Sequence, residues 1–208
     1  NDAESLKKGG NAFFGGKLPT FDVKEIAKDY DTNQVTADQK YYQKRFIIEG
    51  TIANIGSGIG NEPYIAFNGK NMFLQPQAHF SQPNIQKISK LKKGQKLRLV
   101  CTGSVAIVGT PTLNYCNFLD DYADQEMNKA KNQIKDFLNG KTPKDERIGL
   151  VTIISVAMAR ILPEDSSCLS DTNKCGEELS KVKSDPNMKN MISLVAEEFK
   201  KAGVQNPD

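Results

Sequence analysis

The sequence is poor in the residues from which metal centres and catalytic sites are most often built. It has one histidine, His79, and four cysteines, and no two cysteines form a Cys-x-x-Cys pair. A structural zinc site needs four ligands with close local spacing, so we expect no metal and no cofactor. His79 stands alone in a proline-rich loop, and no serine or cysteine lies in a nucleophile motif. We therefore expect a protein that is not an enzyme.

Long apolar runs are also missing. The longest run, residues 148–162, is interrupted by Arg160, whereas a helix that spans a bilayer needs about 20 apolar residues. The sequence shows no signal peptide, but it begins without Met, as a processed or trimmed chain would, so export stays open. We expect contact with a membrane only through a removed or lipidated N-terminus.

A strong excess of positive charge is absent as well. The chain has 28 Lys and Arg residues against 25 Asp and Glu residues, a net charge of +3. Proteins specialised for nucleic acids usually carry a larger or more clustered excess, so this balance argues against a nucleic-acid partner. The glycine-rich segment 56–60 lacks the Gly-Lys-Ser/Thr ending of a phosphate-binding loop, and it predicts an ordinary loop.

The region between residues 45 and 118 contains five strand-like segments and one short helix. The strands show the alternation of apolar and polar residues that is typical of a half-buried sheet. Their order, three strands, a helix and two strands, is that of an OB fold, a small five-stranded barrel. The segments are Arg45–Ile55, Tyr64–Phe67, Met72–Gln75, the helix Pro83–Leu91, Lys96–Val105 and Thr112–Phe118. Within them, Asn68-Gly69 predicts a hairpin turn and Gly50 a bend or bulge.

The cysteines predict two disulfides, because they are even in number and close in pairs. The pairs are Cys101 with Cys116 and Cys168 with Cys175. If Cys101 faces Cys116 across the last hairpin, then Gly103 faces Asn114. Disulfides persist in oxidising compartments, so we expect a periplasmic or otherwise exported protein. The alternative is four free thiols in a cytosolic protein.

The segments on either side of the barrel complete the predicted fold. Residues 1–19 predict a flexible leader, and Thr20–Tyr30 predicts a helix followed by a polar link. After Leu119 the apolar spacing becomes helical. The expected fold class is therefore α+β, a five-stranded OB barrel (20–119) preceded by a helix and followed by a small all-helical domain (120–208). Its helices are expected at Asp120–Leu138, Ile148–Ile161 and Leu179–Val182, with a last one beginning at Asp185-Pro186.

Several short motifs carry a resemblance to known families. In order along the chain they are Tyr30-Asp31-x-Asn33-x-Val35-x-Ala37-Asp38-x-Lys40-Tyr41, Glu49-Gly50-Thr51-Ile52-x-x-Ile55-Gly56, Leu91-Lys92-Lys93-Gly94-Gln95-Lys96-Leu97, and Cys101-x-Gly103 with Asn117. With these motifs the chain resembles the tRNA_anti-like family of exported OB-fold proteins. The resemblance implies an OB barrel after an N-terminal helix, an envelope or lipoprotein setting and no established enzymatic activity. The family name records a fold likeness and does not establish RNA binding.

The C-terminal half carries a second resemblance. The residues are Leu162-Pro163-Glu164, which lie near a cysteine, and Leu194-Val195-Ala196-Glu197 in the last helix. They are similar to segments of small periplasmic immunity proteins of the Tai type, which protect bacteria from secreted toxins. This resemblance implies a protein partner.

Two groups of residues are candidates for binding. An OB face that binds nucleic acid needs basic residues and stacking aromatics, and the candidates for such a ligand face are Arg45, Tyr64, Lys70 and Arg98. The alternative for the two arginines is a solvated face beside Glu49. A lysine cluster could meet an anionic partner, such as a lipid headgroup or polysaccharide, or be a solvated helix end. It consists of Lys87, Lys90, Lys92, Lys93 and Lys96.

These patterns lead to two functional hypotheses. The first is a non-enzymatic binding protein of the bacterial envelope with a protein partner, of which immunity to a toxin is one version. The second is a binder of nucleic acid or oligosaccharide that uses the outer face of the OB barrel.

Overall fold

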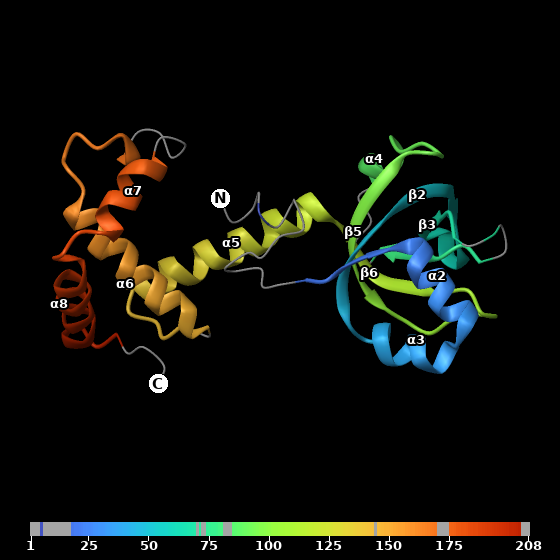
Figure 1. Cartoon of the computed structure of the whole chain (residues 1–208), viewed down its shortest axis with the longest axis horizontal. Helices are drawn as coiled ribbons and strands as arrows, with labels where there is room; N and C mark the ends of the chain where they lie inside the picture. Colours follow the sequence, from blue (N-terminus) through green and yellow to red (C-terminus); the bar gives the residue numbers. More distant parts are fainter. Residues whose placement is uncertain are drawn as a thin grey trace. The chain divides into compact units, whose positions relative to one another are not determined.

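The structure, a computed structural model, describes Ser5 and residues 18–69, 71, 74–80, 85–143, 145–169 and 175–204. The chain divides into two compact units, Asn1–Met127 and Asn128–Asp208. Helix α5 (Leu119–Leu138) begins in the first unit and ends in the second (Figure 1). The predicted leader, residues 1–19, lies almost entirely outside the described residues.

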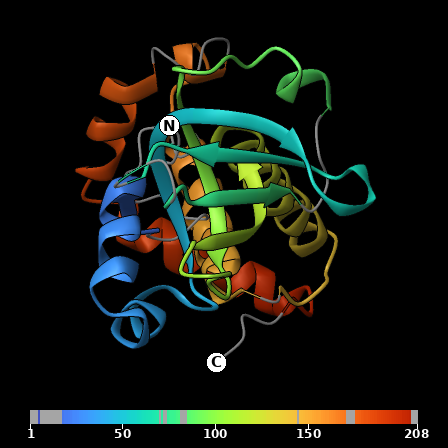
Figure 2. The ribbon, with the colours of Figure 1, turned by 90° about the vertical axis from the view of Figure 1, so that its right-hand side faces the viewer.

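The first unit is built on a closed barrel of five strands (Figure 2). They are β2 (Arg45–Ser57), β3 (Pro63–Phe67), β4 (Gln77–Phe80), β5 (Lys96–Gly103) and β6 (Thr112–Phe118). The order is β2-β3-β4-β6-β5, and β5 pairs with β2 to close the barrel. Only the β4–β6 pairing within the barrel is parallel. This arrangement confirms the predicted α+β fold with an OB barrel.

The inner face of the barrel is a continuous apolar core, because every second residue of each strand points inward. Helices α2 (Val23–Thr32) and α3 (Gln34–Tyr41) extend this core. The fully buried residues from the strands include Phe46, Ile48, Ile52, Ile65, Phe67, Leu99 and Leu113, and the helices add Val23, Ile26, Tyr30, Ala37 and Tyr41. The short helix α4 (Ile85–Ile88) contributes Ile88.

The segment before the barrel differs from the prediction. Thr20–Asp22 forms a strand, β1, parallel to β2, and α2 begins only after it. The helix starts there because the Asp22 carboxylate accepts the Lys24 N–H at 2.7 Å and so caps it. The predicted polar link contains a second helix, α3, which buries only Ala37 and Tyr41. Two buried positions are too few to show the helical repeat of apolar residues from which a helix is predicted.

Hydrogen bonds explain why the first family motif has its particular residues. The Tyr30 hydroxyl donates to Asp38 at 3.0 Å, and the Tyr41 hydroxyl donates to Asp29 at 2.8 Å. Asn33 caps α3 by accepting the Thr36 N–H at 3.1 Å. These contacts join α2 to α3 above the barrel core. The motif is therefore structural.

The third barrel strand also lies elsewhere than predicted. The prediction was Met72–Gln75, but β4 is Gln77–Phe80, and the described part of the predicted segment, Leu74 and Gln75, is not in a strand. The connection from β3 is therefore a longer loop, and Asn68-Gly69 is not a two-residue hairpin turn, since Ala66 pairs with Gln77. The apolar residues before Gln75 have the composition of a strand. The observed strand shows the alternation of buried and half-buried residues over Gln77–Phe80.

Two local predictions on β2 and β6 are corrected in detail. Gly50 permits close packing of α2, because a Cβ there would lie 2.3 Å from Cγ2 of Val23, and the register shift of β2 falls between Ile52 and Asn54. The Cys101–Cys116 disulfide is confirmed. Beyond it, Gly103 faces Leu113 rather than Asn114, because the register between β5 and β6 shifts by one residue near Tyr115, whose φ is +54°.

The second unit is helical. After α5 come α6 (Glu146–Ile161), α7 (Cys175–Lys183) and α8 (Met188–Lys201), with a 3₁₀ turn at Ser167–Leu169. The predicted Cys168–Cys175 disulfide is confirmed and joins this turn to α7. Phe137 stacks on Phe199, with ring centroids 5.1 Å apart. None of the described helices is long and apolar enough to cross a membrane.

Candidate binding face of the barrel

One outer face of the barrel, formed by β2 and β5, is covered by the start of α5. Ile47 and Val100 point outward there and are buried with Leu119, Tyr122 and Ala123. The Arg45 guanidinium lies 5.8 Å from the centroid of the Tyr122 ring. On the same face Arg98 Nε is 3.5 Å from Glu49 Oε2.

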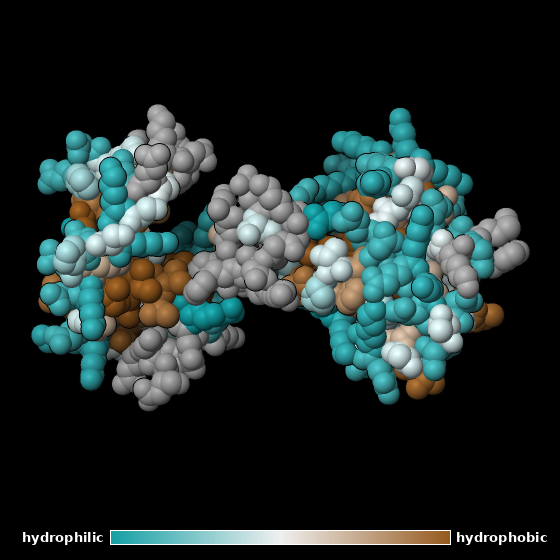
Figure 3. All heavy atoms as spheres, in the orientation of Figure 1, coloured by the Kyte–Doolittle hydropathy of each residue, from teal (hydrophilic) through white to brown (hydrophobic). Residues whose placement is uncertain are grey.

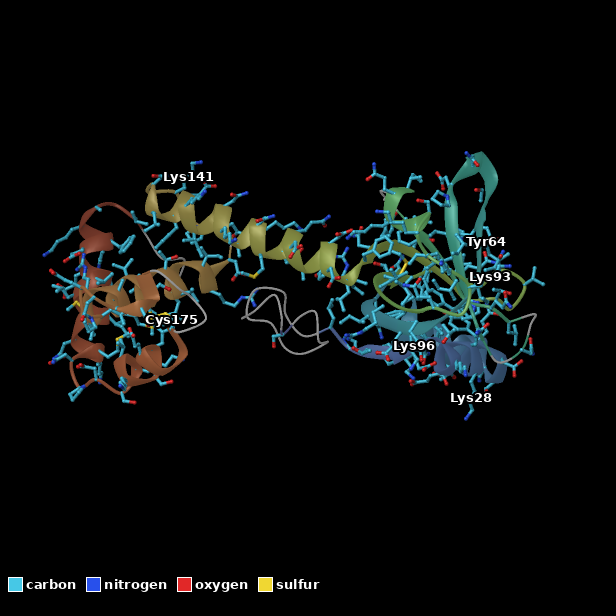
Figure 4. The ribbon with its side chains drawn as sticks, turned by 90° about the horizontal axis from the view of Figure 1, so that it is seen from above. Lys28, Tyr64, Lys93, Lys96, Lys141 and Cys175 are labelled. Carbon is cyan, nitrogen blue, oxygen red and sulfur yellow. A yellow bond between two sulfur atoms is a disulfide. The ribbon has the colours of Figure 1, made fainter. Side chains whose placement is uncertain are left out.

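The other outer face, formed by β3 and β4, carries an aromatic pair. Tyr64 and His79 are directly opposite in the register, and their ring centroids are 5.9 Å apart with an interplanar angle of 28°. Their neighbours Ile65 and Ala78 belong to the core, so Tyr64 and His79 point outward. Both side chains are half-buried. We call this pair the Tyr64–His79 platform (Tyr64 is labelled in Figure 4).

The Tyr64 ring lies flat on the sheet because its neighbour on β2 is a glycine. Gly56 is its register partner, and a Cβ at Gly56 would lie 2.9 Å from Cε1, Cζ and Oη of Tyr64. The absence of a side chain at Gly56 therefore lets the ring cover the backbone. The ring is half-buried, so part of its aromatic surface stays accessible for stacking.

A pocket of about 440 Å³ adjoins this platform. The wall of the pocket includes Gly56, which pairs with Tyr64 across the sheet, and Pro63, which precedes Tyr64 in the sequence. Among the described residues, the wall has no charged side chain and is mainly aliphatic; its other residues are Ile55, Ser57, Asn61, Ile85, Ile88, Ser89 and Leu91. Its volume lies in the range of small-ligand and side-chain pockets.

Comparison with known families places the barrel unit in one of them. The model of the tRNA_anti-like family matches residues 2–117, more than half of the chain. The chain belongs to the tRNA_anti-like family. A crystal structure of a lipoprotein from Klebsiella pneumoniae subsp. pneumoniae MGH 78578, for which nucleic-acid binding has been proposed, is 19% identical with a TM-score of 0.41. The match covers 49% of this chain and 91% of that chain. No curated protein sequence matches the chain.

The ligand face predicted for this tRNA_anti-like protein is not brought together in the structure. Tyr64 lies on the open β3–β4 face, whereas Arg45 and Arg98 lie on the face that α5 covers. Lys70 lies outside the described residues. The sequence predicts His79 to be an isolated loop residue, whereas in the structure His79 lies in β4 and pairs with Tyr64 of β3.

The surroundings of His79 favour its uncharged form. Burial lowers the pKa of its imidazole, and the nearby Glu62 carboxylate only partly offsets this effect. The described residues of the platform and of the pocket wall therefore bring no positive charge to the site at pH 7, and Glu62 brings a negative one.

The lysine cluster divides into two parts. Lys87 forms an ion pair with Asp121 at the start of α5 and lies 5.3 Å from the centroid of the Phe118 ring. It therefore helps to hold α4 against α5. Lys90, Lys92, Lys93 and Lys96 are exposed between α4 and β5 (Lys93 and Lys96 are labelled in Figure 4). Within the described ranges, no three His, Cys, Asp or Glu side chains are placed to share a metal ion.

Proposed function

We propose that this protein is a non-enzymatic binding module that works outside the cytoplasm and holds an uncharged oligosaccharide on the Tyr64–His79 platform. The observation that carries the proposal is the flat Tyr64 ring beside an uncharged His79 on the outer face of β3 and β4. OB folds bind oligonucleotides and oligosaccharides on the corresponding strands and the loops beside them.

The chemistry of the platform suits a sugar ring. A pyranose presents a face of C–H groups, which stacks on an aromatic face, and a rim of hydroxyls, which need hydrogen-bond partners. Gln77 shares the outer face of β4 with His79, because residues two apart point the same way. Ser57, the last residue of β2, and Asn61, in the loop that follows, are both exposed. Gln77 therefore offers an amide on the face of the platform, and the wall of the adjoining pocket holds the Ser57 hydroxyl and the Asn61 amide.

A nucleic-acid ligand fits this face less well. Single-stranded nucleic acids are held by stacking together with cations that neutralise the phosphates. The two arginines predicted for that purpose lie on the β2–β5 face, away from Tyr64, and Glu62 beside His79 would repel a phosphate. Of the two ligand classes that OB folds bind, we therefore propose the oligosaccharide rather than the nucleic acid.

The setting outside the cytoplasm is supported by the two disulfides, which persist in oxidising compartments. The protein partner and the immunity role indicated by the C-terminal sequence stay predictions. None of the contacts described above for the helical unit supports either prediction.

Titration calorimetry of the full chain tests the proposal. The probes are a short, uncharged N-acetylglucosamine oligomer and an oligothymidylate of similar length. We expect saturable, salt-insensitive binding of the sugar, weakened at least ~5-fold by Tyr64→Ala, since stacking on an aromatic ring contributes about 1–3 kcal/mol. Tyr42→Ala is the matched control, because Tyr42 is also a partly exposed tyrosine, at 41% exposure, on the same barrel unit.

Two results would contradict this function. One is the absence of sugar binding, or an equal loss of affinity in Tyr64→Ala and Tyr42→Ala. The other is salt-sensitive binding of the oligothymidylate that disappears in Tyr64→Ala, which would make the platform a nucleic-acid site.

A further inference from the structure

The hairpin between β5 and β6 ends in a tight turn at Val108-Gly109. The Ile107 N–H donates to the Thr110 carbonyl and the Thr110 N–H donates to the Ile107 carbonyl, both at 2.9 Å. The turn residues have φ values of +50° and +77°. Two consecutive residues with positive φ in a two-residue loop are the geometry for which hairpins usually use Asn-Gly or Asp-Gly.

Val108 is a poor choice for the backbone of this turn. A β-branched residue in the left-handed region is strained, whereas asparagine adopts it readily. The Val108 side chain makes no compensating burial, since it is 98% exposed. Neither burial nor backbone preference within the described residues accounts for valine at this position.

Val108 is part of a larger apolar surface. Val105 is 55% exposed and Ile107 is 60% exposed. We call Val105, Ile107 and Val108 the apolar tip. Figure 3 shows hydrophobic residues at the place where this hairpin projects in Figure 1. From Gly103 to Leu119 the sequence has no charged residue, so the chemistry of the tip suits an uncharged, apolar surface.

The barrel itself offers a surface of that kind. The pocket beside the platform has an uncharged, mainly aliphatic wall, and Ile85 on it is 58% exposed. Two other hollows of the same unit, one lined by Lys96, Arg98 and Asp120 and one by Lys28, Asp29 and Lys40, are charged. Of these three, only the aliphatic pocket matches the chemistry of the tip.

The tip and the pocket lie at opposite ends of the barrel. β4 begins at Gln77, which pairs with Thr112 at the base of the hairpin, and Gln77 N–H donates to Pro111. The pocket lies toward the other end of β4, where His79 pairs with Tyr64 and Pro63 follows in the wall. The tip therefore cannot fill the pocket of its own barrel.

We propose that the apolar tip of one copy docks into the aliphatic pocket of a second copy. Because the two surfaces are different and lie at opposite ends, the contact is head-to-tail and can continue into short open chains. A tip of three side chains buries less than the roughly 1,200 Å² of stable interfaces, so the association is weak and depends on concentration. It uses neither Tyr64 nor His79, so its failure leaves the proposed sugar site untouched.

Sedimentation velocity of the full chain, from micromolar to millimolar concentration, tests the proposal. We expect the wild type to shift to larger species as its concentration rises. Val108→Asp removes the tip and Ile85→Asp removes the pocket, and each variant alone is expected to stay monomeric. Mixed together they are expected to form a one-to-one dimer and nothing larger, since only one tip and one pocket remain intact.

Two further variants serve as controls. Val108→Asn keeps the turn geometry and is expected to fold at least as well as the wild type but to lose association. Val35→Asp changes another exposed valine, at 69% exposure, in the first turn of α3, and should associate like the wild type. A wild type that stays monomeric overturns the proposal. So does association that survives Ile85→Asp, which would indicate contact between two tips, and so does a mixture that does not dimerise.

Discussion

The two outer faces of the barrel differ in what covers them. Both follow the same alternation along their strands, but the β2–β5 face carries Ile47 and Val100 under α5, whereas the β3–β4 face carries Tyr64 and His79 with part of their surface open. Aliphatic side chains that point outward require a cover, and aromatic or polar ones do not. The comparison teaches that Tyr64 and the two arginines, which the sequence groups into one ligand face, lie on different faces of the barrel.

The largest effect is expected on the covered face. Ile47→Ala removes a fully buried side chain between β2 and α5 and should cost about 3 kcal/mol of unfolding free energy. Urea unfolding of the full chain measures this loss. Tyr64→Ala is the comparison on the open face and should cost less than half as much, because its ring is only half-buried. Equal losses would show that the two faces do not differ in this way.

A smaller effect is expected from the pH dependence of stability. His79 is the only histidine, and burial lowers its pKa, partly offset by Glu62. The unfolded chain therefore binds the proton more readily. The contribution of His79 to the free energy of unfolding falls as the pH drops from about 6.5 through the lowered pKa, and it stays constant below that pKa. Above that window His79 contributes no pH dependence.

Urea midpoints from about pH 7.5 to about pH 5 measure this dependence. His79→Gln should remove the part of the slope that lies just below pH 6.5. An unchanged slope in His79→Gln would show that His79 is solvated and inert, as an isolated loop histidine would be.

The smallest effect is expected from the arginines on the covered face. Arg45→Ala and Arg98→Ala each remove a partly exposed contact, to Tyr122 and to Glu49, and should cost at most about 1 kcal/mol. Neither should alter sugar affinity in calorimetry. A clear loss of affinity in Arg98→Ala would return the ligand to the β2–β5 face.

Much of the fold could be predicted from the sequence. The strand order of the barrel and both disulfides follow from alternation and from cysteine positions, and β6 was predicted with its observed bounds. Helix α3 could not be predicted, because tertiary contacts of Tyr41 and Ala37 stabilise it rather than a long apolar face. The position of β4 was wrong because apolar loop residues before Gln75 gave a stronger local signal than Gln77–Phe80.

The candidate site was less predictable for a related reason. Tyr64 was identified, but His79 gains its role only from the strand pairing that places it beside Tyr64, and the misplaced strand hid that pairing. Likewise, the packing position of α5 decides which outer face stays open, and the apolar periodicity of a helix does not predict where that helix packs. The outward Ile47 and Val100 were the one signal in the sequence that could have indicated a covered face.

The most direct test of the open face as the binding face is a map of amide chemical-shift changes while the uncharged N-acetylglucosamine oligomer is titrated into the full chain. The account predicts the largest changes at Gly56, Tyr64 and His79, with Arg45 and Arg98 unchanged. Changes centred on Arg45 and Arg98, with Tyr64 and His79 silent, would contradict it.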